Sequence, residues 1–179
     1  MKVILSRKGF DSGTGGYPSP ILPDGRLISL PIPSSRLGDD LLHYSNLQLD
    51  RSNSYFKLML DLSSRILYEN TWHILNVDSE CHLDPDIYKN IVQRHPLWKP
   101  LFGQIDMAQS HLDKQGVEEG DLFLFFGWFR TVRQLNSTFS FDNSDQDKHV
   151  IFGYFQIGEV LRVNSKAKVP DWMKRLIPY

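Results

Sequence analysis

The sequence predicts an α+β fold in a single domain, with a short N-terminal strand, several helices, and a C-terminal antiparallel sheet or small barrel. Three observations predict it. A length of 179 residues suits one domain with a substantial core. Apolar residues recur at helical spacing in the first two thirds of the chain, and two β-rich runs follow. We therefore treat residues 1–179 as one domain.

The N-terminal elements are short. Residues 3–5 form an apolar run that predicts a first buried strand, and a loop rich in glycine and proline follows it. Residues 25–33 alternate in polarity and predict an edge strand, which Pro31 and Pro33 would end. Residues 39–50 have a mixed pattern that favours no element.

Helices are predicted in the middle of the chain. Apolar residues at helical spacing predict one over residues 53–67, with Ser52 or Asn53 as its N-cap. The segment that ends in Gly116 predicts a short helix within residues 103–117.

Another helix is expected between these two. Asp84 is a suitable N-cap, and Pro85 would occupy the first helical position. This helix would end by Pro96.

Two β-rich runs dominate the C-terminal part. The run "DLFLFFGWF" (121–129) is continuously apolar and predicts a central buried strand. Residues 149–163 predict a second strand, in which Gly153 and Gly158 suggest bulges or a close approach of backbone. The polar residues 134–148 between the runs predict a long, mobile connection.

Composition excludes several classes of protein. The net charge of −1 argues against strong nonspecific DNA binding, although binding of one base or nucleotide is compatible with it. The single cysteine excludes an internal disulfide, and we expect a cytoplasmic protein. No apolar run is long enough to span a membrane, and no spacing of histidine or cysteine predicts a metal site.

Several blocks together resemble a known family. They are "MKVILSRKGFDS", "GGYPSPILPDGRLISLPIP", "HLDPD", "GQIDMAQSHL" and "GVEEGDLFLFFGWF". The chain resembles the nucleotide modification associated domain family, third type. This resemblance implies a role in phage or bacterial systems that modify DNA bases, with nucleotide or nucleic acid (DNA rather than RNA) as the partner. It implies no particular reaction, and the cofactor is unknown.

Two further expectations come with this resemblance. Residues 117–163 look like half of the barrel of PUA-like domains, including their ASCH and EVE relatives, which hold a nucleobase. We also expect the family to continue past "VPDWMKRLIPY" with a histidine-containing segment. Such a C-terminal segment, or a protein partner, would then complete the site.

The first candidate binding residues follow the first strand. They are Ser6, Arg7, Lys8 and Asp11, with Tyr17 further along the glycine loop. Amide groups of such a loop can surround an anion. Arg7 can donate two hydrogen bonds to one phosphate, and Tyr17 can stack on a base. A surface loop with solvated charges is the alternative.

The helix predicted over 103–117 carries a second set of polar residues. On a helix, Asp106 and Gln109 share a face and could read a base edge together with Gln104. An enzyme would use Asp11, Asp106 or His111 as its acid or base. The alternative for these helix residues is an ordinary solvated surface.

The end of the apolar run provides a third set. Strand alternation sends Trp128 and Arg130 to the same side, where they could stack on a base and pair with phosphate. A core tryptophan beside a rim arginine is the alternative. The motif "HLDPD" presents His82, Asp84 and Asp86, which predict a metal or acid–base cluster or, with better support, helix capping.

These residues leave three functional hypotheses. The first is a protein that binds or acts on a nucleotide or modified nucleobase, as a group-transfer enzyme if it is catalytic. The second is a noncatalytic, PUA-like reader of modified bases. The third is a protein-interaction module in phage–host conflict, which an exposed apolar patch would favour.

Overall fold

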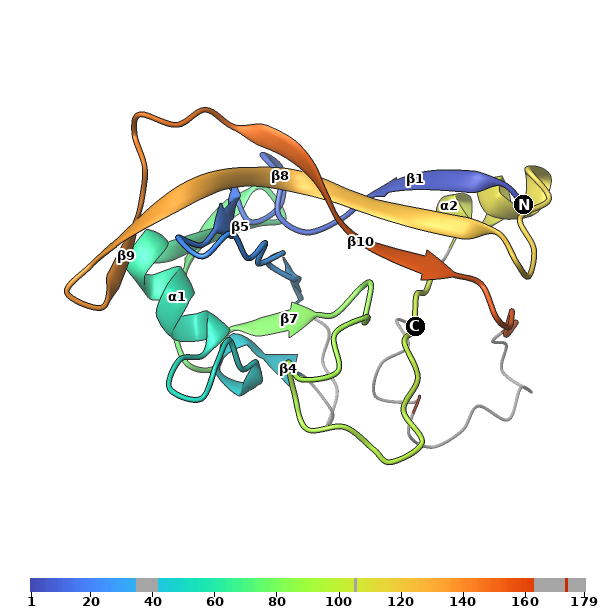
Figure 1. Cartoon of the computed structure of the whole chain (residues 1–179), viewed down its shortest axis with the longest axis horizontal. Helices are drawn as coiled ribbons and strands as arrows, with labels where there is room; N and C mark the ends of the chain where they lie inside the picture. The colour runs from blue at the N-terminus through green and yellow to red at the C-terminus, as the bar shows by residue number, and fades with distance from the viewer. Residues whose placement is uncertain (35–41, 105, 163–172, 174–179) are drawn as a thin grey trace.

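The computed structural model describes residues 1–34, 42–104, 106–162 and 173. The long strand β8 (Leu122–Leu135) is the central strand of its main sheet. Strands β1 (Val3–Arg7) and β2 (Ser19–Ile21) pair with β8 in parallel. Strands β10 (Lys148–Gln156) and β9 (Thr138–Phe141) pair with it antiparallel, so the sheet is mixed (Figure 1). The fold is therefore a mixed arrangement of helices and strands in which β8 pairs with all four partners.

Smaller elements pack beside this sheet. The order in a second sheet is β3, β7, β4, and β5 and β6 form a hairpin. Their bounds, with the 3-10 helix η1, are β3 (Ile32–Pro33), β4 (Leu42–His43), η1 (Tyr44–Asn46), β5 (Arg65–Tyr68), β6 (Thr71–Ile74) and β7 (Glu80–His82). The predicted edge strand over 25–33 is thus reduced to its last two residues.

The two helices fall within predicted ranges. Helix α1 (Tyr55–Leu62) begins after Ser54, whose side chain accepts a hydrogen bond from the amide of Lys57 at 3.2 Å. It ends before residue 67, because residues 65–68 pair with β6. Helix α2 (Asp106–Lys114) is likewise shorter than predicted.

The prediction of a helix from Asp84 to Pro96 is wrong. No helix forms there, because the two carboxylates expected at its first turn have other partners. Asp84 binds the ammonium group of Lys8, and Asp86 binds the guanidinium group of Arg94. These ion pairs replace the capping interactions that the sequence favours.

The C-terminal pairing of β8 with β10 is confirmed, but the described strands do not close into a barrel. The register shifts between Ile151 and Gly153, so Gly153 lies at the expected bulge. Gly158 lies beyond β10 with nothing within 4 Å of a Cβ there, so no close backbone approach occurs. The stretch 134–148, expected to be a connection, contains β9, and part of the strand expected over 149–163 extends beyond the described residues.

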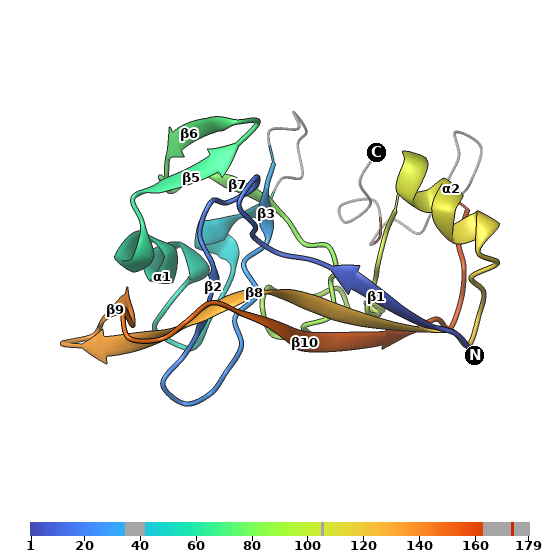
Figure 2. The ribbon, with the colours of Figure 1, turned by 90° about the horizontal axis from the view of Figure 1, so that it is seen from above.

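Both helices lie on one side of the sheet (Figure 2). Two apolar clusters fill the space between the sheet and the elements on this side. The larger surrounds α1 and includes Tyr44, Leu58 and Met59, and the smaller centres on Phe123 and Phe125 of β8. Neither described helix is long and apolar enough to cross a membrane.

Candidate functional site

The other side of the sheet is open along β1, β8 and β10, where no described helix or strand covers it (Figure 2). Alternation on β8 buries Phe123 and Phe125, at 3% and 0% exposure, and turns the residues between them outward. The strand register then places matching residues of β1 and β10 on the same side. We call the following outward positions the outer face: Val3, Leu5, Arg7, Leu122, Leu124, Phe126, Trp128, His149, Ile151, Tyr154 and Gln156.

The outer face is apolar and aromatic. Leu5 is 65% exposed and Tyr154 is 73% exposed, while Phe126 and Trp128 in the middle strand are partly covered by their neighbours. The ring centroids of Phe126 and His149 lie 6.1 Å apart in an edge-on arrangement. The prediction of a central strand is confirmed, because β8 lies between β1 and β10, but only one of its sides is fully buried. A continuous apolar run cannot show whether both sides of a strand are covered.

The charge of the outer face has one sign. Its positions carry one arginine, Arg7, and one histidine, His149, and no carboxylate. The acidic side chains that neighbour it belong to loops. A guanidinium nitrogen of Arg7, whose side chain is 47% exposed, lies 4.0 Å from Asp11. This separation is the limit of an ion pair, so Arg7 is available to another anion.

Asp11 itself organises the glycine loop. One of its carboxylate oxygens accepts hydrogen bonds from the amides of Gly13 and Thr14, at 2.8 and 2.7 Å. The amides of Gly15 and Gly16 donate to backbone carbonyls. The amides of residues 13–16 thus already have acceptors within the chain, and the binding of an external anion by this loop stays a prediction. A catalytic role of Asp11 stays a prediction.

Trp128 and Arg130 lie together, as alternation predicts. The guanidinium of Arg130 and the indole of Trp128 both donate to Asp147, which directly precedes β10. Burial raises the pKa of Asp147, but these hydrogen bonds outweigh it and leave the pKa below its ordinary value. Arg130 is consequently less available to phosphate than Arg7 is.

Ser6 and Lys8 point to the opposite, inner side of the sheet. Ser6 pairs with the buried Phe125. The ammonium of Lys8 lies 2.6 Å from Asp84 and 4.6 Å from the ring centre of Phe102, and both charged side chains are nearly covered. The structure therefore separates Lys8 from Arg7 by the thickness of the sheet.

Tyr17 lies in the core and not on the surface of the loop, so the prediction that it stacks on a base is not supported. It is 8% exposed and packs edge-on against Phe10 and Phe141. Burial raises the pKa of its hydroxyl. Its ring thus serves packing.

The predicted residues of α2 also lie away from the outer face. Leu112 packs α2 into the cluster of Phe123, on the inner side of the sheet. Asp106 and His111 lie on this helix, and Gln109 donates to Asp113 at 3.2 Å. Gln104 precedes the helix and donates to the carbonyl of Gly103. Their binding and catalytic roles stay predictions, and the structure does not bring them to Arg7 or Trp128.

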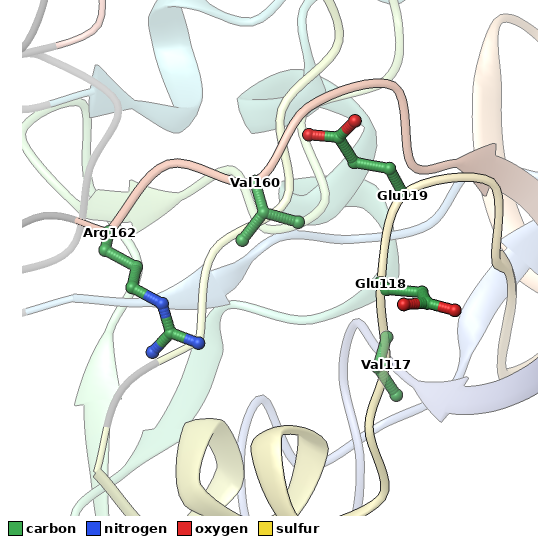
Figure 3. Close-up of a pocket in the computed structure, with 5 residues that line it drawn as sticks. All are labelled: Val117, Glu118, Glu119, Val160 and Arg162. Carbon is green, nitrogen blue, oxygen red and sulfur yellow. The ribbon is translucent and has the colours of Figure 1, made fainter.

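A pocket opens elsewhere, between the turn before β8 and the segment after β10 (Figure 3). Its lining holds none of the residues predicted from the sequence. Arg162, on one side of the pocket, binds Asp113 at 3.1 Å. The lining residues are Val117, Glu118, Glu119, Val160 and Arg162. Among the described residues, no group of three or more histidine, cysteine or acidic side chains could hold a metal ion.

Of the outer-face positions, sequence reasoning named only Arg7 and Trp128, and it missed the three further aromatic rings. Phe126, His149 and Tyr154 come together only through the pairing of β8 with β10. Their signal in the sequence is alternation, because each is followed or preceded at two residues by another outward side chain. The outward residues of β1 alternate in the same way, but their pairing with β8 has no local signal, since the two strands are separated by more than a hundred residues.

The geometry defines a class of protein: a mixed α/β domain whose sheet exposes an aromatic, carboxylate-free face. The model of the family described as nucleotide modification associated domain 3 matches residues 2–178, so the chain belongs to that family. The resemblance seen in the sequence is thereby confirmed. No curated protein and no solved structure matches the chain.

Proposed function

We propose that this domain binds nucleobases on its outer face, as a noncatalytic reader in a nucleotide-modification system. The observation that carries this proposal is the row of Phe126 and Trp128 on β8, flanked by His149 and Tyr154 on β10. Aromatic rings on a sheet stack on bases without needing a particular sequence. The family's association with nucleotide modification supports a ligand of this class.

The charge of the outer face supports the same ligand. A nucleotide or nucleic acid carries phosphate, to which an exposed guanidinium can donate two parallel hydrogen bonds. Arg7 pairs in register with Phe126, so a cation stands beside an aromatic ring. No carboxylate occupies a position of the outer face, and the neighbouring Asp11 and Asp147 each lie beside an arginine. We propose DNA rather than RNA as the partner, as the resemblance of the sequence to this family implies; the family description itself names only nucleotide modification.

An enzyme remains the alternative within this class. A group transfer to a base would need Asp11, Asp106 or His111 near the bound base. Asp106 and His111 belong to α2, which packs on the inner side of the sheet through Leu112. The reader is favoured because the rings and the cation share one face, which Asp106 and His111 do not join. Asp11 lies beside Arg7, but one of its carboxylate oxygens accepts hydrogen bonds from the amides of the glycine loop.

A protein-interaction module is the second candidate function. The observation that favours it is the exposure of aliphatic side chains on the outer face, since Val3, Leu5 and Ile151 are all more than half exposed. Exposed apolar patches mark docking sites for proteins as well as for other ligands. In that case no nucleotide or oligonucleotide would bind.

A thermal-shift screen of nucleotides, modified nucleosides and short oligonucleotides tests the proposed function. A ligand at a hundred times its dissociation constant stabilises the fold by about 2.7 kcal/mol. For a domain of this size, we expect Tm to rise by roughly 5–10 °C. Replacing Arg7 with glutamine should reduce the rise, because a phosphate contact is lost.

Arg26→Gln provides the matched control. Arg26 is 49% exposed and binds Asp24, much as Arg7 is 47% exposed beside Asp11, but it lies in the loop after β2. We expect this control to keep the full rise in Tm. A flat screen, or an equal loss in both variants, would contradict nucleobase binding on the outer face and favour a protein partner.

A further inference from the structure

We infer that the outer face takes an unpaired nucleic-acid strand rather than a duplex, an inference that rests on the proposed function. The spacing of the rings carries it. Phe126 and Trp128 stand two residues apart on one face of β8. Two residues of a strand span about 6.8 Å. Consecutive ring positions therefore repeat at this distance along the strand.

A duplex offers these rings no free base face. Its bases are stacked about 3.4 Å apart along each strand, and each base covers the face of the next. A side chain that stacks on a base needs that face free, as it is in unpaired nucleic acid. Bases that have separated from one another can occupy consecutive rings on β8.

Neighbouring strands widen the platform. Tyr154 lies opposite Leu124, and His149 lies opposite Trp128, on the adjacent strand β10. Adjacent strands are about 4.8 Å apart, so these rings adjoin the row on β8. Arg7 lies on the other side of that row, opposite Phe126, where it can contact the backbone of the bound strand.

The shape and charge of the outer face also disfavour a duplex. A protruding helix can read the major groove, and no described helix lies on this side of the sheet. Duplex binders neutralise many phosphates, whereas the outer face offers Arg7 and, at its end, an Arg130 already bound to Asp147. The affinity must therefore come mainly from stacking, for which an unpaired strand provides the free faces.

Fluorescence anisotropy on the full chain tests this inference. The probes are a short labelled oligodeoxynucleotide, its duplex with the complement, and the matching oligoribonucleotide. Stacking of one base on an aromatic side chain contributes roughly five- to 150-fold in affinity. We expect the unpaired strand to bind at least about tenfold more tightly than the duplex.

Tyr154→Ala and Ile74→Ala form a matched pair of variants. Tyr154 is 73% exposed on the outer face and Ile74 is 75% exposed on β6, so neither change removes a buried side chain. Tyr154→Ala should weaken binding of the strand by roughly five-fold or more. Ile74→Ala should leave it unchanged.

The salt dependence gives an independent readout. For single strands, the slope of log affinity against log salt is about −0.7 for each phosphate neutralised. We expect a slope no steeper than about −1.4 for the unaltered chain, since two guanidinium groups adjoin the rings. Arg7→Gln should make the slope about 0.7 shallower.

The outcomes separate the inference from the proposed function. Duplex binding as tight as strand binding, with both lost in Tyr154→Ala, overturns the inference and keeps the proposed function. A lack of binding to every probe overturns both. Preference for the oligoribonucleotide supports the unpaired strand and changes only the sugar that it carries.

Discussion

Replacing Arg94 with methionine is expected to lower the free energy of unfolding by about 3–5 kcal/mol, because the change leaves a buried carboxylate without its cation. The side chains of Arg94 and Asp86 are only 8% and 2% exposed. Arg94 donates to both oxygens of Asp86, and it also donates to the carbonyl of Tyr88 at 2.7 Å. The indole of Trp98 donates to the same carboxylate at 3.0 Å.

The ion pair joins the middle of a segment to one of its ends, and backbone hydrogen bonds join the two ends. Asp86 and Leu101 exchange two backbone hydrogen bonds, and Arg94 lies in the chain between them. Just beyond this closure, Phe102 packs under β8, with its ring centre 4.7 Å from that of Phe123. Loss of Arg94 should therefore also loosen the support beneath the sheet.

Chemical denaturation measures the effect, with Arg162→Met as the control. Arg162 also binds a carboxylate, that of Asp113, but its side chain is 73% exposed. Exposed pairs contribute under about 1 kcal/mol, so this variant should unfold almost as the unaltered chain does. Equal effects in the two variants would show that burial of the Arg94–Asp86 pair has no energetic importance.

Local patterns in the sequence predicted several elements of the fold. The apolar run 121–129 identified β8, and helical spacing around Met59 identified α1. Each signal lies within one element, so no distant partner is needed to recognise it. The lengths were less well predicted, since β8 extends to Leu135 by pairing with β9.

The failed helix shows where local reasoning stops. Asp84 and Pro85 have the pattern of a helix start, yet the partner of Asp84 is Lys8, which lies 76 residues away. An ammonium within 2.6 Å provides a charged partner for the carboxylate, which a helix N-terminus provides only as a partial charge. No sequence pattern within residues 84–96 indicates the contact of Asp84 with Lys8.

In the candidate site, too, relations within one strand could be predicted, and contacts between distant strands could not. Alternation correctly placed Trp128 and Arg130 on one side of their strand, because that relation is local. The joining of Arg7 to this side depends on the parallel pairing of β1 with β8. The contact of Lys8 with Asp84 on the inner side is also distant in sequence, and no pattern in the loop indicates it.

The glycine loop packs closely against Phe10, and the variant Gly15→Ala tests this contact. At Gly15 the backbone has a φ of +86°, and a Cβ would lie 2.1 Å from the ring of the buried Phe10. The left-handed conformation costs about 1–2 kcal/mol with a side chain, and overpacking costs about 1–3 kcal/mol more. We expect a total loss of about 2–5 kcal/mol in the free energy of unfolding.

Gly25→Ala separates these two costs in the same denaturation experiment. Gly25 has a φ of +87°, and nothing lies within 4 Å of a Cβ built there. It should therefore lose only the backbone part, about 1–2 kcal/mol. The difference between the variants measures the packing of Gly15 against Phe10, beside its two hydrogen bonds to Leu67. Equal losses would mean that the loop needs glycine for its backbone conformation alone, and that the contact with Phe10 adjusts without cost.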